Sequence, residues 1–190
     1  MNWLPYDGKV HYYPSVFDRE TAQHYFKELL AACLWKQDEV IMFGKKIITD
    51  RKSAWYGDEP FGYTYSKITR YALPWNKPLK EIKQILEYQT GEQFNSCLLN
   101  LYHSGKEGMG WHADDEPEMK RYGAIGSLSL GAARKFSFKH KTTKEKVDIQ
   151  LENGSLLLML HDTQEKWLHS LPKSLKVLEP RINLTFRTFV

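Results

Sequence analysis

Three side chains with the donor atoms of a metal site lie in the second half of this chain: His112, Asp114 and His169. Residues two apart on an extended segment point to the same side, so His112 and Asp114 can present an imidazole and a carboxylate to one ion. Two histidines and one carboxylate form the facial triad of non-haem Fe(II) oxygenases, which leaves coordination positions open. A His-x-Asp pair also arises often by chance, and His169 alone would fit an ordinary core or rim histidine.

The segment 181–187 is a candidate anion-binding strand. Its residues alternate strictly between apolar and polar, as in a half-buried β-strand. One face carries Ile182, Leu184 and Phe186, and the other carries Arg181, Asn183, Thr185 and Arg187. A guanidinium binds a carboxylate through two parallel hydrogen bonds, so this polar face could hold a ligand with an anion at each end. Taken alone, the polar face also fits an edge strand in water.

A second polar strand face precedes the His-x-Asp pair. Leu98, Asn100 and Tyr102 share this face, on which Asn100 offers an amide and Tyr102 a phenol. Together with the triad and the arginines of segment 181–187, these groups form a set that a 2-oxoglutarate molecule needs. An iron chelates its keto acid, and a cation binds its far carboxylate. Without the triad, the two polar residues would fit a hydrogen-bonded pair within a sheet. With it, we expect the polar face of segment 181–187 to point inward, toward an iron.

Two amphipathic helices come before these strands. Asp18 can cap a helix whose apolar residues recur from Ala22 to Cys33, and Asn76 can cap another at about residues 78–89 that ends at Gly91. We expect both helices to cover one side of a sheet.

The pattern after Gly91 is that of β-strands. Turn residues such as Asn153-Gly154 separate most of them. The predicted strands are 94–103, 125–130, 134–140, 145–151, 155–161, 166–171 and 181–189. Seven or more short strands without alternating helices indicate an antiparallel sandwich, barrel or jelly roll. Residues 39–68 are predicted to form hairpins and loops outside the core.

Composition excludes several classes of protein. The chain has 190 residues, 42% of them hydrophobic and 14% aromatic, which fits one domain with a real core and excludes a disordered chain. No apolar run approaches the roughly 18–20 residues of a membrane span, and we expect no signal peptide. Two cysteines, Cys33 and Cys97, fit a reducing cytoplasm, or a nucleus in a eukaryote. The net charge of +4 is compatible with a polyanionic partner.

The motifs together resemble those of the AlkB family of Fe(II)/2-oxoglutarate dioxygenases, and the resemblance covers about residues 40–189 in order. It looks closest to the branch with the animal DNA-repair homologues two and three. The motifs are Asn100-Leu101-Tyr102, His112-Ala113-Asp114-Asp115-Glu116, Ser127-Leu128-Ser129-Leu130-Gly131, Arg134-Lys135-Phe136, Gly154-Ser155-Leu156-Leu157, His169-Ser170-Leu171-Pro172 and Pro180 to Arg187, with Met42-Phe43-Gly44-Lys45, Tyr56-Gly57-Asp58 and Tyr63-Thr64-Tyr65 marking the branch. Relatives often have Arg where this chain has Ala113, and Trp111 is also unusual for the branch.

The resemblance implies a fold and a role for each matching residue. The fold is α+β and mainly β: a double-stranded β-helix (jelly roll) core, N-terminal amphipathic helices packed on one sheet, and a nucleotide-recognition hairpin lid. Residues 1–190 would form a single domain, with the lid at about 40–70 and the core at about 94–189. The catalytic Fe(II) ligands would be His112, Asp114 and His169, and the 2-oxoglutarate site Asn100, Tyr102, Arg181, Asn183, Thr185 and Arg187. The substrate-binding residues would be Met42, Phe43, Gly44, Tyr63, Thr64, Tyr65, Asp115 and Glu116.

Within these sites, Arg181 and Tyr102 would bind the far carboxylate, while Arg187 and Asn100 would lie near the metal. Phe43 would fill the gap left by a flipped base, since an apolar wedge lowers the cost of the vacated position. A hairpin residue folded onto the core is the alternative for Phe43, and cross-strand packing the alternative for Tyr63 and Tyr65.

The activity implied is oxidative demethylation of N-alkylated bases with Fe(II), 2-oxoglutarate and O2, releasing succinate and formaldehyde. The expected substrates are 1-methyladenine and 3-methylcytosine in single- or double-stranded DNA, with RNA as a further candidate, and the expected enzyme is a monomer with no membrane partner. Such lesions are cationic, which the carboxylates of Asp115 and Glu116 would favour. An oxygenase for protein or small-molecule substrates and a non-catalytic nucleic-acid-binding module remain the alternatives.

Overall fold

The computed structural model describes residues 1–42, 45–65 and 68–190, and side chains outside 38–47 and 63–70. Helix α1 (Arg19–Ala32) starts at Asp18, whose carboxylate accepts the backbone N–H of Thr21. Helix α2 (Lys77–Thr90) starts at Asn76 and ends at Gly91, which has a φ of 75°. Both helices lie where the capping residues predicted them. A third helix, α3 (Thr163–Lys166), is a single turn that was not predicted.

The described strands form two main sheets and one small one. The large sheet has the antiparallel order β1-β12-β9-β14-β7-β3-β2, with the short β6 paired in parallel to β3. The second sheet has the order β11-β10-β13-β8, and β4 pairs with β5. The strands of the large sheet are β1 (Lys9–Tyr13), β2 (Lys36–Met42), β3 (Lys45–Gly57), β6 (Leu73–Pro74), β7 (Ser96–Tyr102), β9 (Ile125–Gly131), β12 (Leu156–Leu160) and β14 (Arg181–Arg187). The others are β4 (Gly62–Tyr65), β5 (Ile68–Tyr71), β8 (Met109–His112), β10 (Arg134–His140), β11 (Lys146–Leu151) and β13 (Trp167–Leu171).

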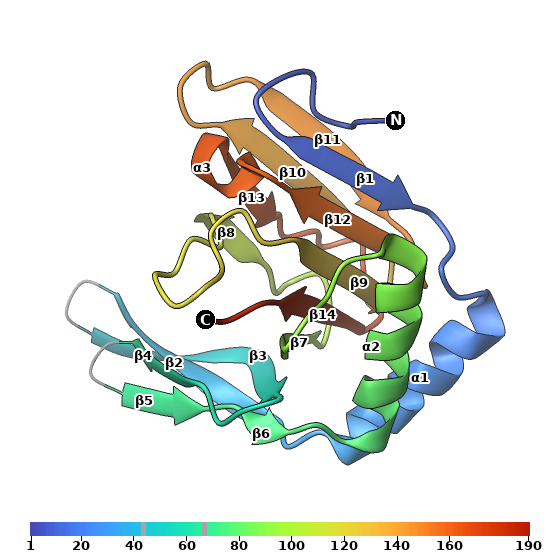
Figure 1. The fold of residues 1–190 in the computed structure, drawn as a ribbon. Coiled ribbons are helices and arrows are strands. Elements are labelled where there is room, and N and C mark those ends of the chain that lie inside the picture. Colours follow the sequence, from blue (N-terminus) through green and yellow to red (C-terminus); the bar gives the residue numbers. More distant parts are fainter. Residues whose placement is uncertain (43–44, 66–67) are drawn as a thin grey trace.

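The molecule has three layers, because each side of the large sheet is covered (Figure 1). Helices α1 and α2 pack on its outer face, where one cluster of buried residues joins Leu29 of α1 and Ile82 of α2 to Leu184 of β14. A second cluster, which includes Phe138 and Leu157, fills the space between the two sheets. This is the predicted jelly roll with its helices on one sheet.

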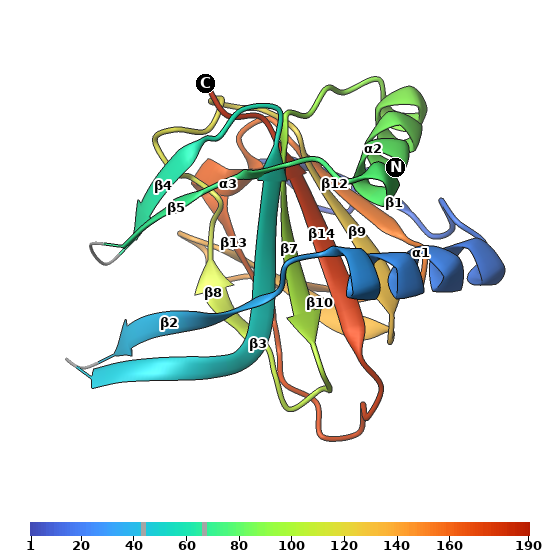
Figure 2. The ribbon, with the colours of Figure 1, turned by 90° about the horizontal axis from the view of Figure 1, so that it is seen from below.

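One prediction about the fold is wrong in part. Residues 39–68 do not all lie outside the core, because β3 pairs with β7 inside the large sheet and its Ala54 and Tyr56 are only 6% and 3% exposed. The first half of β3 extends beyond the core with β2, on the side of the molecule where β4 and β5 also lie (Figure 2). Nowhere in β3 do apolar and polar residues alternate as in a half-buried strand, so no pattern in its residues marks the part that lies in the core.

The turn at Asn153-Gly154 lies as predicted. Gly154 has a φ of 78°, and a Cβ there would collide with the carbonyl oxygen of Phe17, so only glycine fits. Both cysteines are buried and free. In the described part of the chain, no helix is long and apolar enough to cross a membrane.

Candidate active site

The sheet between β8 and β13 brings the two predicted histidines together. His169 lies directly opposite His112 in the β8–β13 ladder, and their ring centroids are 4.3 Å apart. Asp114 follows two residues after the end of β8, in a segment without regular structure. Donor atoms of the three residues all lie within 4.8 Å of one another. The three side chains thus form a compact set that could hold one metal ion, as their order in the sequence predicted.

Both histidines are oriented for a metal. The Nδ1 of His112 lies 2.9 Å from the carbonyl oxygen of Gly110, which can only accept, so Nδ1 carries a proton and Nε2 is the nitrogen available to a metal. His169 is 4% exposed and stacks on Phe136 at 5.4 Å between ring centroids. Burial lowers the pKa of His169 to about 4, so its imidazole is neutral at pH 7. A neutral imidazole is the form that metals bind.

Asp114 is a buried carboxylate that stays ionised. Burial is the largest influence and works to raise its pKa, but Arg187 and the two histidines together lower the pKa below its usual value. The Nη2 of Arg187 donates to Oδ1 of Asp114 at 2.9 Å. An ionised carboxylate beside two imidazoles fits the ligand set of a divalent iron.

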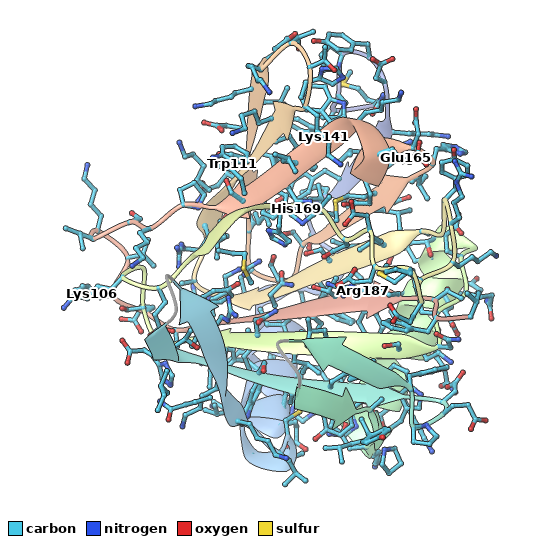
Figure 3. All side chains as sticks on the ribbon, turned by 90° about the vertical axis from the view of Figure 1, so that its left-hand side faces the viewer. Lys106, Trp111, Lys141, Glu165, His169 and Arg187 are labelled. Atoms are coloured by element: carbon cyan, nitrogen blue, oxygen red, sulfur yellow. The ribbon has the colours of Figure 1, made fainter. Side chains whose placement is uncertain are left out.

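The polar face of β14 points inward, as the alternating pattern predicted. Arg181, Thr185 and Arg187 are 2%, 7% and 7% exposed. Their neighbours on β7 complete this wall, since Arg181 lies opposite Tyr102 and Asn183 lies opposite Asn100. Figure 3 shows Arg187 and His169 together in the space between the sheets. The residues predicted for the metal and for 2-oxoglutarate therefore line one interior.

Arg181 is a buried guanidinium that could bind an anion. Its Nη2 donates to Ser129 at 2.9 Å and to Asn183 at 2.7 Å, but its buried Nε has no hydrogen-bond partner. No carboxylate in the described part of the chain pairs with it. Burial lowers its pKa to about 10, which still leaves it charged at pH 7. A buried cation without a counter-ion is costly, so this site fits the far carboxylate of a dicarboxylic acid.

Arg187 differs from Arg181, because two carboxylates already surround it. Besides Asp114, Glu116 lies 3.6 Å from its Nη1. Burial raises the pKa of Glu116, Arg187 opposes the shift, and Asp114 and Asp115 add to it. The Oε2 of Glu116 is buried and has no hydrogen-bond partner. Arg187 thus lies beside the candidate metal ligand Asp114, as the family resemblance implied.

The predicted substrate-binding residues are only partly placed. Asp115 is at the surface, with its side chain 63% exposed and 3.8 Å from Nζ of Lys141, whereas Glu116 faces the interior. Met42 ends β2, and Tyr63, Thr64 and Tyr65 belong to β4, but the positions of their side chains are not described. Phe43 and Gly44 lie outside the described residues. Their roles stay predictions.

Two contributors to the site were not predicted from the sequence. Ser129, on β9, holds Arg181, and its place in an alternating strand beside β14 was the available signal. Gln164, on α3, accepts the backbone N–H of Asp114 at 2.9 Å through its Oε1. Nothing in the spacing of Gln164 marks it, because the contact joins a loop to a single-turn helix fifty residues away.

Comparisons with known proteins agree with this geometry. A family model described as 2OG-Fe(II) oxygenase superfamily matches residues 9–187. The human alpha-ketoglutarate-dependent dioxygenase alkB homolog 3 is 40% identical over 191 residues, which cover 95% of this chain and 66% of the relative. The Bos taurus DNA oxidative demethylase ALKBH2 is 39% identical over 186 residues, which cover 92% of this chain and 67% of the relative.

A solved structure, that of OsALKBH1, shares the fold. It matches with a TM-score of 0.63 at 12% identity and covers 94% of this chain and 97% of that chain. The chain spans about two thirds of the length of the curated relatives that it matches.

Proposed function

The chain belongs to the AlkB family of the 2OG-Fe(II) oxygenase superfamily, in the branch of homologues 2 and 3, and from this premise we propose that it is an oxidative demethylase for N-alkylated bases in nucleic acid. The proposed substrates are 1-methyladenine and 3-methylcytosine in DNA, single- or double-stranded, and also in RNA. We propose that residues 1–190 act as one monomeric domain in a reducing compartment, cytoplasmic or nuclear.

The residues that line the interior would form two adjacent binding regions, one for the metal and one for the far carboxylate of 2-oxoglutarate. His112, Asp114 and His169 would hold Fe(II). Arg181 and Tyr102 would bind the far carboxylate of 2-oxoglutarate, with Asn183 and Thr185 beside them and Asn100 and Arg187 toward the metal. When bound, Fe(II) with 2-oxoglutarate and O2 supplies the oxidising power to hydroxylate an N-methyl carbon, with succinate, carbon dioxide and formaldehyde as by-products.

The observation that carries this proposal is the unpaired guanidinium of Arg181 on the same interior wall as the triad. A triad alone would suit other metal chemistry. A buried cation without a carboxylate partner in the described residues adds the need for an anion in the same interior as the metal. A dicarboxylic cosubstrate meets that need and chelates the metal with its other end.

Selection of a cationic lesion would depend on the carboxylates that follow Asp114. Glu116 is partly buried, where a charge interaction is stronger than in water, and Asp115 is exposed and close to Lys141. We therefore expect Glu116→Gln to reduce the preference for cationic 1-methyladenine over a neutral methylated base more than Asp115→Asn does. Equal effects of the two substitutions on this ratio of rates would contradict this assignment.

The direct test is mass spectrometry of defined oligonucleotides after incubation with Fe(II), ascorbate and 2-oxoglutarate. Single- and double-stranded DNA and RNA carrying 1-methyladenine or 3-methylcytosine should lose the mass of one CH₂ group and yield succinate in equal amount. His112→Ala should abolish both products. Binding of methylated DNA without succinate would favour the non-catalytic module. Succinate without any loss of mass would favour an oxygenase with a protein or small-molecule substrate.

A further inference from the structure

Gln164 connects helix α3 to the metal-binding segment. Asp114 lies beyond the end of β8, so the strand ladder offers no acceptor for its backbone N–H. The Oε1 of Gln164 takes that role at 2.9 Å. A buried N–H without an acceptor is costly, so this single hydrogen bond fixes the backbone from which the Asp114 carboxylate extends.

The Gln164 side chain is itself fixed at its other end. Its Nε2 lies 3.3 Å from Sδ of Met159, a residue of β12 that is 2% exposed. Its backbone carbonyl accepts from Nζ of Lys141 at 2.9 Å, and Lys141 also faces Asp115. Helix α3 is therefore tied to the start of the 114–116 segment at two points. Figure 3 shows Lys141 and Glu165 on the same side of His169.

We propose that Gln164 is a positioning residue that sets the orientation of Asp114 toward the two histidines and so determines the affinity for the metal. This rests on the proposed function only in the identity of the metal ligands. Groups that orient metal ligands typically contribute about 10- to 100-fold in metal affinity. Gln164 does so through the peptide backbone, while Arg187 holds the carboxylate itself.

The test is a titration of the metal-free chain with Co(II), in which the visible absorption of bound Co(II) measures the binding. Gln164→Leu keeps the approximate size of the side chain but removes the acceptor, and it should weaken Co(II) binding about 10- to 100-fold. Gln164→Glu keeps an acceptor oxygen and should bind Co(II) within about threefold of the wild type.

Glu165→Gln is the matched control on the same helical turn. Glu165 pairs at 3.1 Å with the exposed side chain of Arg121 and not with the Asp114 backbone, so its substitution should leave Co(II) affinity unchanged. Thermal unfolding of each metal-free variant distinguishes a local effect from loss of the fold.

A second measurement does not depend on any variant. In the metal-free wild type, the Asp114 amide should exchange with solvent at least about tenfold more slowly than the amide of the surface residue Asp115, because a hydrogen-bonded N–H exchanges only after opening. Equal exchange rates would overturn the inference.

Three other results would also overturn it: a folded Gln164→Leu protein with wild-type Co(II) affinity, equal losses in Gln164→Leu and Gln164→Glu, or an equal loss in Glu165→Gln. Failure of the Gln164 proposal can be told apart from failure of the proposed function. The first is measured as Co(II) affinity of the variants, and the second as demethylation by the wild type. A wild-type chain that binds no Co(II) would overturn both.

Discussion

Arg181 shows at the scale of one residue that this interior is built for a ligand rather than for stability. The residue is 2% exposed, and no carboxylate of the described residues neutralises its guanidinium. Removing this charge from water is costly, and the hydrogen bonds to the neutral side chains of Ser129 and Asn183 offset that cost less than a bound anion would. The same arrangement would be an unexplained defect in a purely structural core.

We therefore expect Arg181→Met to separate stability from ligand binding. The free energy of unfolding of the ligand-free protein should fall by less than about 1 kcal/mol or should rise, because the lost hydrogen bonds are offset by the removed buried charge. The added stability that 2-oxoglutarate gives, about 2.7 kcal/mol at a hundred times its Kd, should disappear. Thermal unfolding with and without 2-oxoglutarate measures both quantities. An unchanged response to 2-oxoglutarate would contradict the role of Arg181.

His169 predicts a pH dependence for the metal-free protein. Its pKa is about 4 in the fold against the ordinary histidine value of 6.5, so between these values the unfolded chain binds more protons. Stability should therefore rise with pH in this window and be lost as the pH falls from about 6.5 toward 4. We expect a loss of about 2 kcal/mol between pH 7 and pH 5 from this residue.

Urea unfolding of wild type and His169→Gln in the presence of a chelator isolates that contribution. The substitution removes the titrating group while it keeps a polar side chain of similar length. The difference in unfolding free energy between the two proteins should shrink as the pH is lowered from 7 to 5. A constant difference would show that His169 titrates with an ordinary pKa.

At the residue scale, the sequence identified the chemical groups better than their environments. The alternation in 181–187 correctly predicted which side chains face inward, because a strand has only two faces. It could not predict that Arg181 is unpaired while Arg187 contacts Asp114 and Glu116, since those contacts come from other strands and loops. Gln164 was missed for the same reason.

At the scale of the elements, local signals predicted those segments whose structure depends on local interactions. Caps at Asp18 and Asn76 placed both long helices, and Gly154 placed a turn. Strand β8 was not predicted as a separate strand, because it has four residues, mostly exposed or half-buried, and exists by pairing with β13. Strand β1 was missed in the same way, since it is defined by pairing with β12.

Asn76 gives a prediction at this scale. Its Oδ1 accepts the backbone N–H of Leu79 at 3.0 Å and so caps α2, whose buried face covers the large sheet. Asn76→Ala should lower the free energy of unfolding by about 1 kcal/mol, whereas Asn76→Asp retains the cap and should cost far less. Urea unfolding at pH 7 measures both changes. Equal losses would show that the cap is not the source of the effect.

Across the whole molecule, positive charge is concentrated in one hairpin. Residues 134–151, which form β10, β11 and their turn, contain six Lys and Arg against two Asp and Glu, a net charge of +4 that equals the net charge of the entire chain. Lys139 and Lys146 lie directly opposite each other, and both contact the ring of Trp111, with Nζ at 4.5 and 5.9 Å from its centroid. Like charges opposite each other do not favour folding, so this pair suits an external polyanion.

The double substitution Lys139→Gln and Lys146→Gln should therefore weaken nucleic-acid binding without damage to the fold. Under the proposed function, KM for a methylated single-stranded oligonucleotide should rise while kcat is unchanged, because neither lysine belongs to the metal or cosubstrate site. The slope of log Kd against log salt should fall by about 1.4, at about 0.7 for each phosphate that a lysine no longer neutralises. The control is Lys77→Gln with Lys80→Gln on α2, which covers the other face of the large sheet, away from the hairpin. A similar fall in slope for the control would mean that nucleic-acid binding depends on the total charge of the protein. It would not then depend on the position of Lys139 and Lys146 near the strand that carries His112.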